Sequence, residues 1–238
     1  MFKENNRESG AARIKPNMFN PNWYVNTKLR ETIEFVIAKH VENKKYEKLV
    51  DYGCGNIPYK PYFMPHIKEY IGADLGQNTN ASIQLTPEGN FPLTDNAVDI
   101  VLSTQVLEHV DNPDLYLAEA SRVLTNDGLL IVTTHGYWMY HPDPQDFWRW
   151  TSAGLKKIIE RNGFEVIDFI GIVGRSATGL QLFQAGLMFK LPKFIKPPFF
   201  FVMQLLIALF DKTTTKETRD KDAAVFIAIA KPKKKSSI

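Results

Sequence analysis

The feature that most constrains the fold is a short apolar run that ends abruptly in two glycines. Residues 48–51 form the run, and Gly53 and Gly55 follow it. A run of this kind predicts a buried strand. Residues without a Cβ let the chain turn sharply and let a ligand approach the backbone. The pattern therefore predicts a strand that leads directly into a ligand-binding turn.

Strand-like and helix-like segments alternate along most of the chain. Apolar runs predict further strands at residues 70–74, 82–85, 97–103, 129–134, 164–170 and 223–230. Helical spacing of apolar residues marks residues 26–41, the stretch after Pro113, and residues 152–161. Asn126, Asp127 and Gly128 predict a turn before the strand at 129–134. Strands that alternate with helices predict an α/β fold with a doubly wound sheet.

Residues 174–221 interrupt this alternation and are rich in Phe, Leu, Lys and Pro. We divide the chain into an N-terminal extension and helix (1–45), an α/β domain (46–173 plus 222–232) and this apolar insert. A bilayer-spanning helix needs about 20 apolar residues, and the run at 199–210 is shorter. The favoured interpretation is a helix pair that covers the substrate pocket. The alternative is peripheral membrane contact through residues 186–210, where lysines and phenylalanines are interleaved.

Composition excludes several classes of function. The formal net charge is only +3, which gives no reason to expect a nucleic-acid partner. The single cysteine, Cys54, excludes an intramolecular disulfide and a cysteine-based zinc cage, and no metal site is predicted. Residues 1–22 lack the apolar core of a signal peptide. We therefore expect a cytoplasmic protein, with the inner face of the membrane as an alternative location.

Acidic residues end the first two predicted strands. The carboxyl ends of parallel strands meet at one edge of the sheet, where ligands bind. Asp51 is placed to attract a cationic ligand, and Asp74 is placed to hold both hydroxyls of a ribose. A dinucleotide site would need a third glycine at position 58, which is Pro58. The pattern therefore favours a nucleoside cofactor without a pyrophosphate over a nicotinamide dinucleotide.

Several motifs together resemble one known family. They are Val50-Asp51-Tyr52-Gly53-Cys54-Gly55, Gly72-Ala73-Asp74, Phe91-Pro92-Leu93-Thr94-Asp95, Val106-Leu107-Glu108-His109-Val110 and Glu119-Ala120-Ser121-Arg122-Val123-Leu124. In this combination the chain resembles the class I methyltransferases, type 11 group. The resemblance implies S-adenosylmethionine as cofactor. It also implies a Rossmann-like, seven-stranded, mostly parallel sheet whose last strand, here residues 223–230, is antiparallel.

The same resemblance assigns roles at the cofactor site. Asp51, Gly53 and Gly55 would contact the methionine side, Asp74 the ribose, and Thr104 and Gln105 would lie beside the sulfonium. The full set of expected cofactor residues is Asp51, Gly53, Cys54, Gly55, Asp74, Leu75, Thr104 and Gln105. Family members often carry an aspartate that contacts the adenine amine. At that place this chain offers only Glu88 or Asn90.

The stretch 135–151 follows the fifth strand and is dense in aromatics, histidines and acids. It resembles a loop of type 11 members that are encoded with surface-polysaccharide enzymes. His141 and His135 are the candidate bases, and Asp146 either orients one of them or is itself the base. Alternatively, Arg149 and its tryptophan neighbours fix the loop, and Asp146 or Thr151 caps the next helix.

The sequence therefore predicts an S-adenosylmethionine-dependent methyltransferase that acts on a small hydroxylated acceptor. A sugar or a glycolipid headgroup is the favoured acceptor, and another small metabolite remains an alternative. A non-catalytic binding module that retains the cofactor fold is a second alternative. His109 is expected either to line the pocket or to make a structural hydrogen bond.

Overall fold

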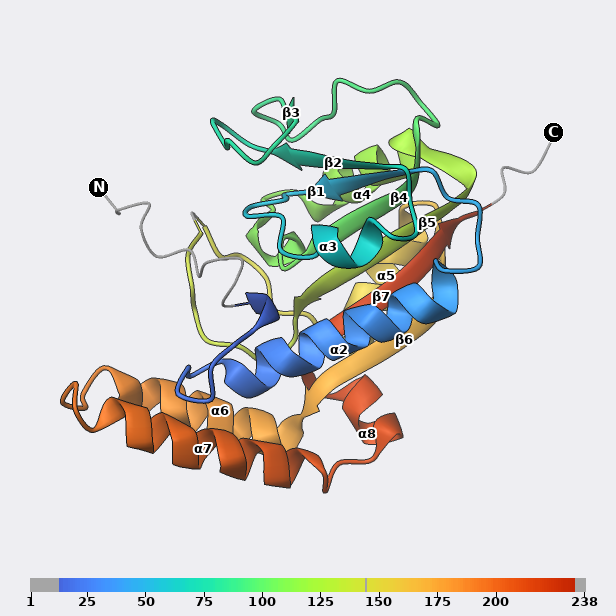
Figure 1. The fold of residues 1–238 in the computed structure, drawn as a ribbon. Coiled ribbons are helices and arrows are strands. Elements are labelled where there is room, and N and C mark those ends of the chain that lie inside the picture. Colours follow the sequence, from blue (N-terminus) through green and yellow to red (C-terminus); the bar gives the residue numbers. More distant parts are fainter. Residues whose placement is uncertain (1–12, 144, 234–238) are drawn as a thin grey trace.

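A seven-stranded sheet runs through the centre of the molecule (Figure 1). The computed structural model describes residues 13–143 and 145–233. The strands are β1 (Lys48–Tyr52), β2 (Glu69–Asp74), β3 (Ile83–Gln84), β4 (Val98–Thr104), β5 (Leu124–His135), β6 (Phe164–Gly174) and β7 (Ala223–Pro232). They lie in the order β3-β2-β1-β4-β5-β7-β6. The order reverses between β1 and β4, which is where open α/β sheets bind their ligands.

Most neighbouring strands are parallel. β1 pairs in parallel with β2 and β4, and β4 pairs in parallel with β5. β7 is inserted antiparallel between β5 and β6. The predicted doubly wound sheet with an antiparallel last strand is thereby confirmed.

Helices cover both faces of the sheet (Figure 1). α2 (Trp23–His40) and α3 (Lys60–Phe63) lie on one face, and α4 (Pro113–Val123) and α5 (Ser152–Arg161) lie on the other. Successive side chains of a strand point to opposite faces. Accordingly, Leu49 of β1 packs in the core under α2, whereas its neighbour Val50 packs in the core under α4.

The two helices behind the sheet begin at residues with side-chain caps. Asn112 accepts hydrogen bonds from the backbone N–H groups of Asp114 and Leu115, and Pro113 occupies the first turn of α4. Thr151 caps α5 by accepting from the N–H of Gly154. These caps bear out the helix start at Pro113 and the capping role considered for Thr151.

The predicted turn at residues 126–128 does not separate two elements. These residues instead form a bulge within β5, because Val98 pairs with Leu124 while Ile100 pairs with Leu129. A Cβ at Gly128 would lie 3.0 Å from the carbonyl oxygen of Asp99. The glycine therefore serves a close approach between two backbones rather than a hairpin turn.

The insert 174–221 contains α6 (Arg175–Met188), α7 (Lys196–Asp211) and α8 (Lys216–Lys221). α6 and α7 form a hairpin that projects past the sheet, on the side where β1, β2 and β4 end (Figure 1). No helix in the described ranges has both the length and the apolar character needed to cross a membrane.

A buried polar cluster fixes this hairpin to the N-terminal part of the chain. The amide of Gln204 in α7 accepts from the N–H of Tyr24 at 2.8 Å and donates to the carbonyl of Pro21 at 2.8 Å. Gln204 also donates to the side-chain oxygens of Gln181 and Gln184 in α6. Because buried amides are costly to leave unpaired, this cluster holds α6, α7 and the start of α2 in one arrangement.

Candidate active site at the strand ends

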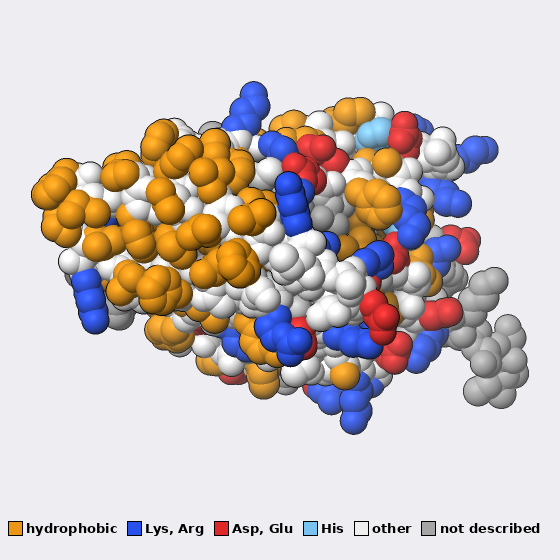
Figure 2. All heavy atoms as spheres, turned by 90° about the horizontal axis from the view of Figure 1, so that it is seen from below, with side chains coloured by type: hydrophobic (Ala, Val, Ile, Leu, Met, Phe, Trp, Pro, Cys, Tyr) orange, Lys and Arg blue, Asp and Glu red, His pale blue; other side chains and the backbone are white. Residues whose placement is uncertain are grey.

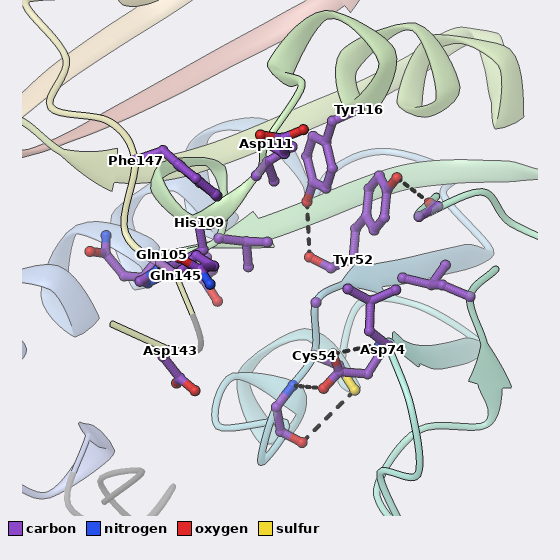
Figure 3. Close-up of a pocket in the computed structure, with 18 of the residues that line it drawn as sticks. Tyr52, Cys54, Asp74, Gln105, His109, Asp111, Tyr116, Asp143, Gln145 and Phe147 are labelled. Carbon is purple, nitrogen blue, oxygen red and sulfur yellow. Dashed lines mark hydrogen bonds between the residues drawn. The ribbon is translucent and has the colours of Figure 1, made fainter. Parts of the chain in front are cut away.

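A cavity of about 600 Å³ lies at the carboxyl ends of β1, β2 and β4. The predicted cofactor residues on its wall are Gly53, Cys54, Gly55, Asp74, Leu75, Thr104 and Gln105. In Figure 3, Cys54 and Asp74 lie on one side of this space, and Gln105 and His109 lie on the other. The strand ends thus bring together predicted cofactor residues that are as many as 52 positions apart, from Gly53 to Gln105.

The glycine turn after β1 has a backbone that other residues rarely adopt. Gly53 has φ of 80° and Gly55 has φ of 50°. A Cβ at Gly53 would lie 2.7 Å from a methyl carbon of Val106. The turn therefore needs glycine for its conformation and for space against the segment that follows β4. This leaves bare backbone facing the cavity, as a bound nucleoside cofactor requires.

Asp74 ends β2 at the cavity wall and is held by several donors. Its Oδ2 accepts from the backbone N–H of Gly55 at 3.1 Å and from the amide of Asn78 at 2.6 Å. Its Oδ1 accepts from the N–H of Leu75 at 2.8 Å. These contacts fix the carboxylate beside the glycine turn, at the place expected for a ribose ligand.

Asp51 differs from the expectation, because it is completely buried and does not line the cavity. Its Oδ2 accepts from the hydroxyl of Tyr70 at 2.5 Å, and its Oδ1 has no hydrogen-bond partner. Burial raises the pKa of Asp51 to about 7. In the structure this carboxyl joins β1 to β2 through Tyr70, inside the protein. Because Asp51 does not line the cavity, its expected contact with the cofactor is not supported.

Gln105 follows β4 in a strained conformation, with φ of 55°. Its backbone N–H donates to the carbonyl oxygen of Thr133 at 2.9 Å, and its side-chain amide donates to the Thr133 hydroxyl at 3.0 Å. The amide oxygen of Gln105 is buried without a partner. Strain of this kind, held by a neighbouring strand, is typical of functional sites.

The structure distinguishes the two residues that the sequence offers for contact with the adenine amine. Glu88 lines the cavity, whereas Asn90 does not. Tyr52 stacks on Tyr116 with ring centroids 3.8 Å apart, and its hydroxyl donates to the carbonyl of Gly89 at 2.5 Å. Of the two substitutes considered for the missing aspartate, Glu88 is therefore the one in position.

A second cavity of about 140 Å³ adjoins the first, and we call it the histidine cavity. His135, Trp138 and His141 line it. It shares five lining residues with the larger cavity: Arg13, Thr104, Gln105, His109 and Asp143. The two spaces therefore meet at the end of β4, where Gln105 and His109 form part of both walls.

Three histidine rings meet at the histidine cavity. The His141 ring centroid lies 4.9 Å from that of His109 and 4.8 Å from that of His135. Nδ1 of His141 faces two acceptors, the Met139 carbonyl at 3.1 Å and Asp146 Oδ2 at 3.2 Å. The Arg149 guanidinium lies farther from the same nitrogen, at 3.4 Å, so the two nearer acceptors favour the proton on Nδ1 and leave Nε2 as the basic nitrogen. Burial lowers the pKa of His141, so the ring is neutral at pH 7.

The Nδ1 atom of His109 also faces an acceptor. Its Nδ1 contacts the carbonyl oxygen of Gln145, so the proton lies on Nδ1 and Nε2 is again the basic nitrogen. The motif residue thus lines the pocket and also makes a structural hydrogen bond, so both interpretations of the sequence are met at once.

Asp146 is not placed to act as a base. It lines neither cavity, and both of its oxygens accept from the Arg149 guanidinium at 2.6 Å. Burial would raise the pKa of Asp146, but the hydrogen bonds from Arg149 and from the N–H of His141 lower it below its usual value. Its contacts with the backbone N–H and the Nδ1 of His141 fit the other predicted role, the orientation of that ring.

Arg149 fastens the loop. Its guanidinium donates to the backbone carbonyls of Trp138 and Met139 as well as to Asp146. Trp148 stacks on Trp150 at 5.6 Å and donates to the carbonyl of Val110. This confirms the structural interpretation of Arg149 and of the tryptophans. Trp138 and Phe147 are the aromatic residues of the loop that reach a cavity.

His135, on the wall of the histidine cavity, forms a buried pair with Glu108, which lines neither cavity. His135 Nε2 lies 3.4 Å from Glu108 Oε1, and the Glu108 Oε2 accepts from the Thr134 hydroxyl at 2.8 Å. Burial holds the pKa of His135 well below its usual value and raises the pKa of Glu108 to about 7. The sequence did not single out Glu108, although the motif Val106–Val110 that contains it was recognised.

The same groups could in principle hold a metal ion. Ligand atoms of Glu108, His135 and His141 all lie within 4.8 Å of one another. However, the Arg149 guanidinium lies 3.4 Å from the His141 ring. A fixed positive charge at that distance opposes cation binding, so proton transfer is the chemistry that these groups support best.

The hairpin α6–α7 does not form a lid over either space. Among the described residues that line the two cavities, none belongs to the segment 174–221. The favoured sequence interpretation of this insert as a cover for the substrate pocket is therefore not supported by its position.

The part of the chain that matches a known family model contains the predicted cofactor residues. Residues 50–132 match the type 11 methyltransferase family model, described as "Methyltransferase domain". A "Probable S-adenosylmethionine-dependent methyltransferase" of Mycolicibacterium smegmatis is 27% identical over 139 residues, which are 52% of this chain and 54% of that protein. A ubiquinone biosynthesis O-methyltransferase of Bartonella bacilliformis is 26% identical over 155 residues, 52% of this chain and 62% of that protein. The chain thus matches between half and two thirds of the length of these relatives.

The fold is also shared with solved structures. The cyclase SpnF superposes with a TM-score of 0.55 at 19% identity, covering 86% of this chain and 81% of that one. At this identity the likeness speaks for the fold alone. The family match spans the glycine turn, Asp74 and the end of β4. Residues 50–132 are therefore similar to the methyltransferase domain of the type 11 group, and the residues that line the larger cavity fit S-adenosylmethionine as the cofactor.

Proposed function

We propose that this protein transfers the methyl group of S-adenosylmethionine to a hydroxyl group of a small acceptor, which enters the histidine cavity. The observation that carries the proposal is the shared wall of the two cavities, to which Gln105 and His109 both belong. A sulfonium at the ends of β1 and β4 would face the histidines across this wall. An acceptor oxygen could then approach the methyl group in line.

The residues fit the cofactor and the chemistry that it supplies. Bound at the glycine turn, S-adenosylmethionine would supply an activated methyl group: the acceptor oxygen would bond to the methyl carbon, and the carbon–sulfur bond electrons would stay on the sulfur. The protein must align the hydroxyl and take up its proton. His141 is our candidate for the base, because Asp146 orients its Nδ1–H and leaves Nε2 free to accept that proton.

His109 has a different role in this proposal. It lines both cavities, so its ring stands where the methyl group would cross. With Nδ1 fixed on the Gln145 carbonyl, its Nε2 can accept a hydrogen bond from the acceptor hydroxyl and orient it. We assign it the positioning of the acceptor, with the proton going to His141.

The acceptor class follows from the size and the lining of the histidine cavity. About 140 Å³ is well below the roughly 300–1,000 Å³ of a typical ligand pocket, so only a small group enters. Trp138 and Tyr59 offer aromatic surface, while Arg13 and Asp143 offer charged partners for hydroxyl groups. A single sugar ring, free or attached to a lipid carrier, combines these properties and is our proposed acceptor.

The test is a methyl-transfer assay with labelled S-adenosylmethionine and a panel of hydroxylated acceptors. We expect His141→Ala to lower kcat by roughly 10²–10⁴-fold while leaving the affinity for S-adenosylhomocysteine unchanged. His66→Ala is the matched control, because His66 lines neither cavity. Tight binding of S-adenosylhomocysteine without turnover on any acceptor would favour a non-catalytic binding module instead. Undiminished turnover of His141→Ala would remove the proposed base.

A further inference from the structure

The outward side of α7 is an exposed apolar surface. Val202, Leu205, Leu206, Leu209 and Phe210 recur at helical spacing and are 54%, 44%, 37%, 59% and 43% exposed. We call these five residues the outer face. In the space-filling view from below, hydrophobic side chains gather over the projecting part of the molecule formed by the hairpin (Figure 2). Soluble monomers rarely expose a contiguous apolar surface of this kind unless it binds something.

The inward side of α7 is already occupied. Phe200, Met203 and Ile207 are buried, and Gln204 belongs to the cluster that joins α6, α7 and α2. Asp211, at the end of the helix, accepts from the Tyr24 hydroxyl at 3.0 Å and from the N–H of Gly174 at 2.7 Å. The helix therefore cannot turn its outer face inward without breaking buried hydrogen bonds. Only an external partner could therefore cover that face.

The tip of the hairpin adds a basic rim with protruding aromatic side chains. Phe189 and Phe194 are 81% and 79% exposed, and they alternate with Lys190, Lys193 and Lys196. The sequence has no Asp or Glu from residue 169 to residue 210. The whole segment therefore carries positive charge only, next to apolar surface.

We propose that the hairpin α6–α7 binds the surface of an anionic lipid bilayer. The outer face and the tip phenylalanines enter the boundary between headgroups and acyl chains, and the three tip lysines contact anionic headgroups. Because the inward side of α7 is fixed against α6 and α2, the helix lies along the bilayer surface. Aromatic and aliphatic residues beside lysines are the composition that such interfacial helices share.

A second copy of the chain fits this surface less well. Self-association through the outer face would bring together segments that hold lysines and arginine but no acidic residue to pair with them. Like charges facing one another at an interface are unfavourable. Anionic lipid supplies the opposite charge, which is why the bilayer is the occupant to which we commit.

The test is cosedimentation of the full chain with two kinds of vesicle. One kind is pure phosphatidylcholine, and the other contains phosphatidylcholine with phosphatidylglycerol. We expect binding to the anionic vesicles at about 0.1 M salt and weakening at about 1 M salt, where the screening length falls from about 10 Å to about 3 Å. Binding needs no cofactor or acceptor, so the result is independent of the proposed methyl transfer.

Two sets of variants locate the contact. Replacing Lys190, Lys193 and Lys196 by Gln should weaken binding about fivefold for each lysine, or roughly a hundredfold in all. The matched control replaces Lys44, Lys45 and Lys157, which are exposed elsewhere, and should bind like the wild type. Replacing Phe189 and Phe194 by Ser should weaken binding by roughly tenfold or more. Phe35→Ser, at a 53% exposed position on α2, is its control.

Three results would overturn the proposal. The first is that the wild type stays in the supernatant with both kinds of vesicle. The second is that the control lysines matter as much as the tip lysines. The third is a stable dimer in sedimentation that Leu205→Ser and Leu209→Ser dissociate, because the outer face would then be covered by a second copy.

Discussion

The two cavities that meet at the end of β4 are built in different ways. The larger one, which we call the cofactor cavity, is built largely from backbone at strand ends. Gly53 and Gly55 have positive φ there, and Asp74 is held by a backbone N–H. The histidine cavity is built from side chains that a loop collects, with Arg149 and Asp146 fixing His141. The first follows from the sheet itself, whereas the second depends on a few hydrogen bonds outside the sheet.

This difference teaches which part of the site can vary. Strand ends of a doubly wound sheet recur in unrelated enzymes, and the cyclase SpnF shares this fold. The family match ends at residue 132, before the loop begins. We therefore expect changes in the cofactor cavity to alter affinity for the cofactor, and changes in the loop to alter turnover. The predictions below separate these two effects.

The largest effect among these changes is expected at Arg149. Arg149→Met removes the donors that fix Asp146 and the backbone of residues 138 and 139. We expect kcat to fall about a hundredfold, because a displaced base is no longer in reach of the acceptor proton. The affinity for S-adenosylhomocysteine should not change. Arg161→Met, which breaks an exposed ion pair with Asp114, is the control. Equal losses of affinity and turnover would contradict the separation.

Asp74 tests the other side of the comparison. Asp74→Ala removes a carboxylate from the cavity wall, where we expect it to hold the ribose. Hydrogen bonds to a charged group contribute about 1.5–3 kcal/mol, so the dissociation constant for S-adenosylhomocysteine should rise roughly 10–100-fold in calorimetry. Asp95→Ala, at an exposed ion pair with Arg122, should leave this constant unchanged. An unchanged constant for Asp74→Ala would place the ribose elsewhere.

The buried carboxyl of Asp51 predicts how stability depends on pH. Its pKa is raised from 3.8 to about 7 in the folded protein because of burial. The native state therefore holds this proton more tightly than the unfolded chain. The stabilisation of the folded state by this bound proton is fully present below pH 3.8 and is lost as the pH rises through 7.

Thermal unfolding of the cofactor-free protein measures this effect. From pH 5 to pH 8 the free energy of unfolding of the wild type should fall further than that of Asp51→Asn, by on the order of 2 kcal/mol. The pKa of Glu108 is raised to about 7 as well, so Glu108 should account for part of the fall in the free energy of unfolding that Asp51→Asn still shows. Parallel curves for the wild type and Asp51→Asn would show that Asp51 titrates normally.

The smallest effect is expected from metal removal. Although Glu108, His135 and His141 could supply ligand atoms, the nearby Arg149 guanidinium disfavours a cation. Treatment with EDTA should leave turnover within error of the untreated protein. Loss of activity that added zinc or magnesium restores would show that the histidine cavity works through a metal ion.

The sequence predicted the elements that depend on local patterns. Apolar runs and glycines identified the strands and the turn at Gly53, because these features reflect backbone conformation over a few residues. Most of the residues predicted to contact the cofactor line one cavity, since parallel strand ends meet at one edge of a sheet. Asp51 lies on β1 beside the cavity but points into the interior, which a motif cannot show.

Long-range contacts limited the rest of the prediction. That Glu108 reaches Thr134 and His135, and that Trp148 donates to the carbonyl of Val110, depends on how the loop folds back over β4 and β5. The position of α6–α7 depends on the buried cluster around Gln204. These contacts join residues far apart in the chain, so spacing alone does not reveal them.

A crystal structure with S-adenosylhomocysteine bound tests the account most directly. We predict that the nucleoside lies along the ends of β1, β2 and β4, with its ribose at Asp74 and its sulfur beside Gln105 and His109, facing the histidine cavity. A nucleoside bound elsewhere, or a sulfur that faces away from the three histidines, would contradict the proposed path of the methyl group.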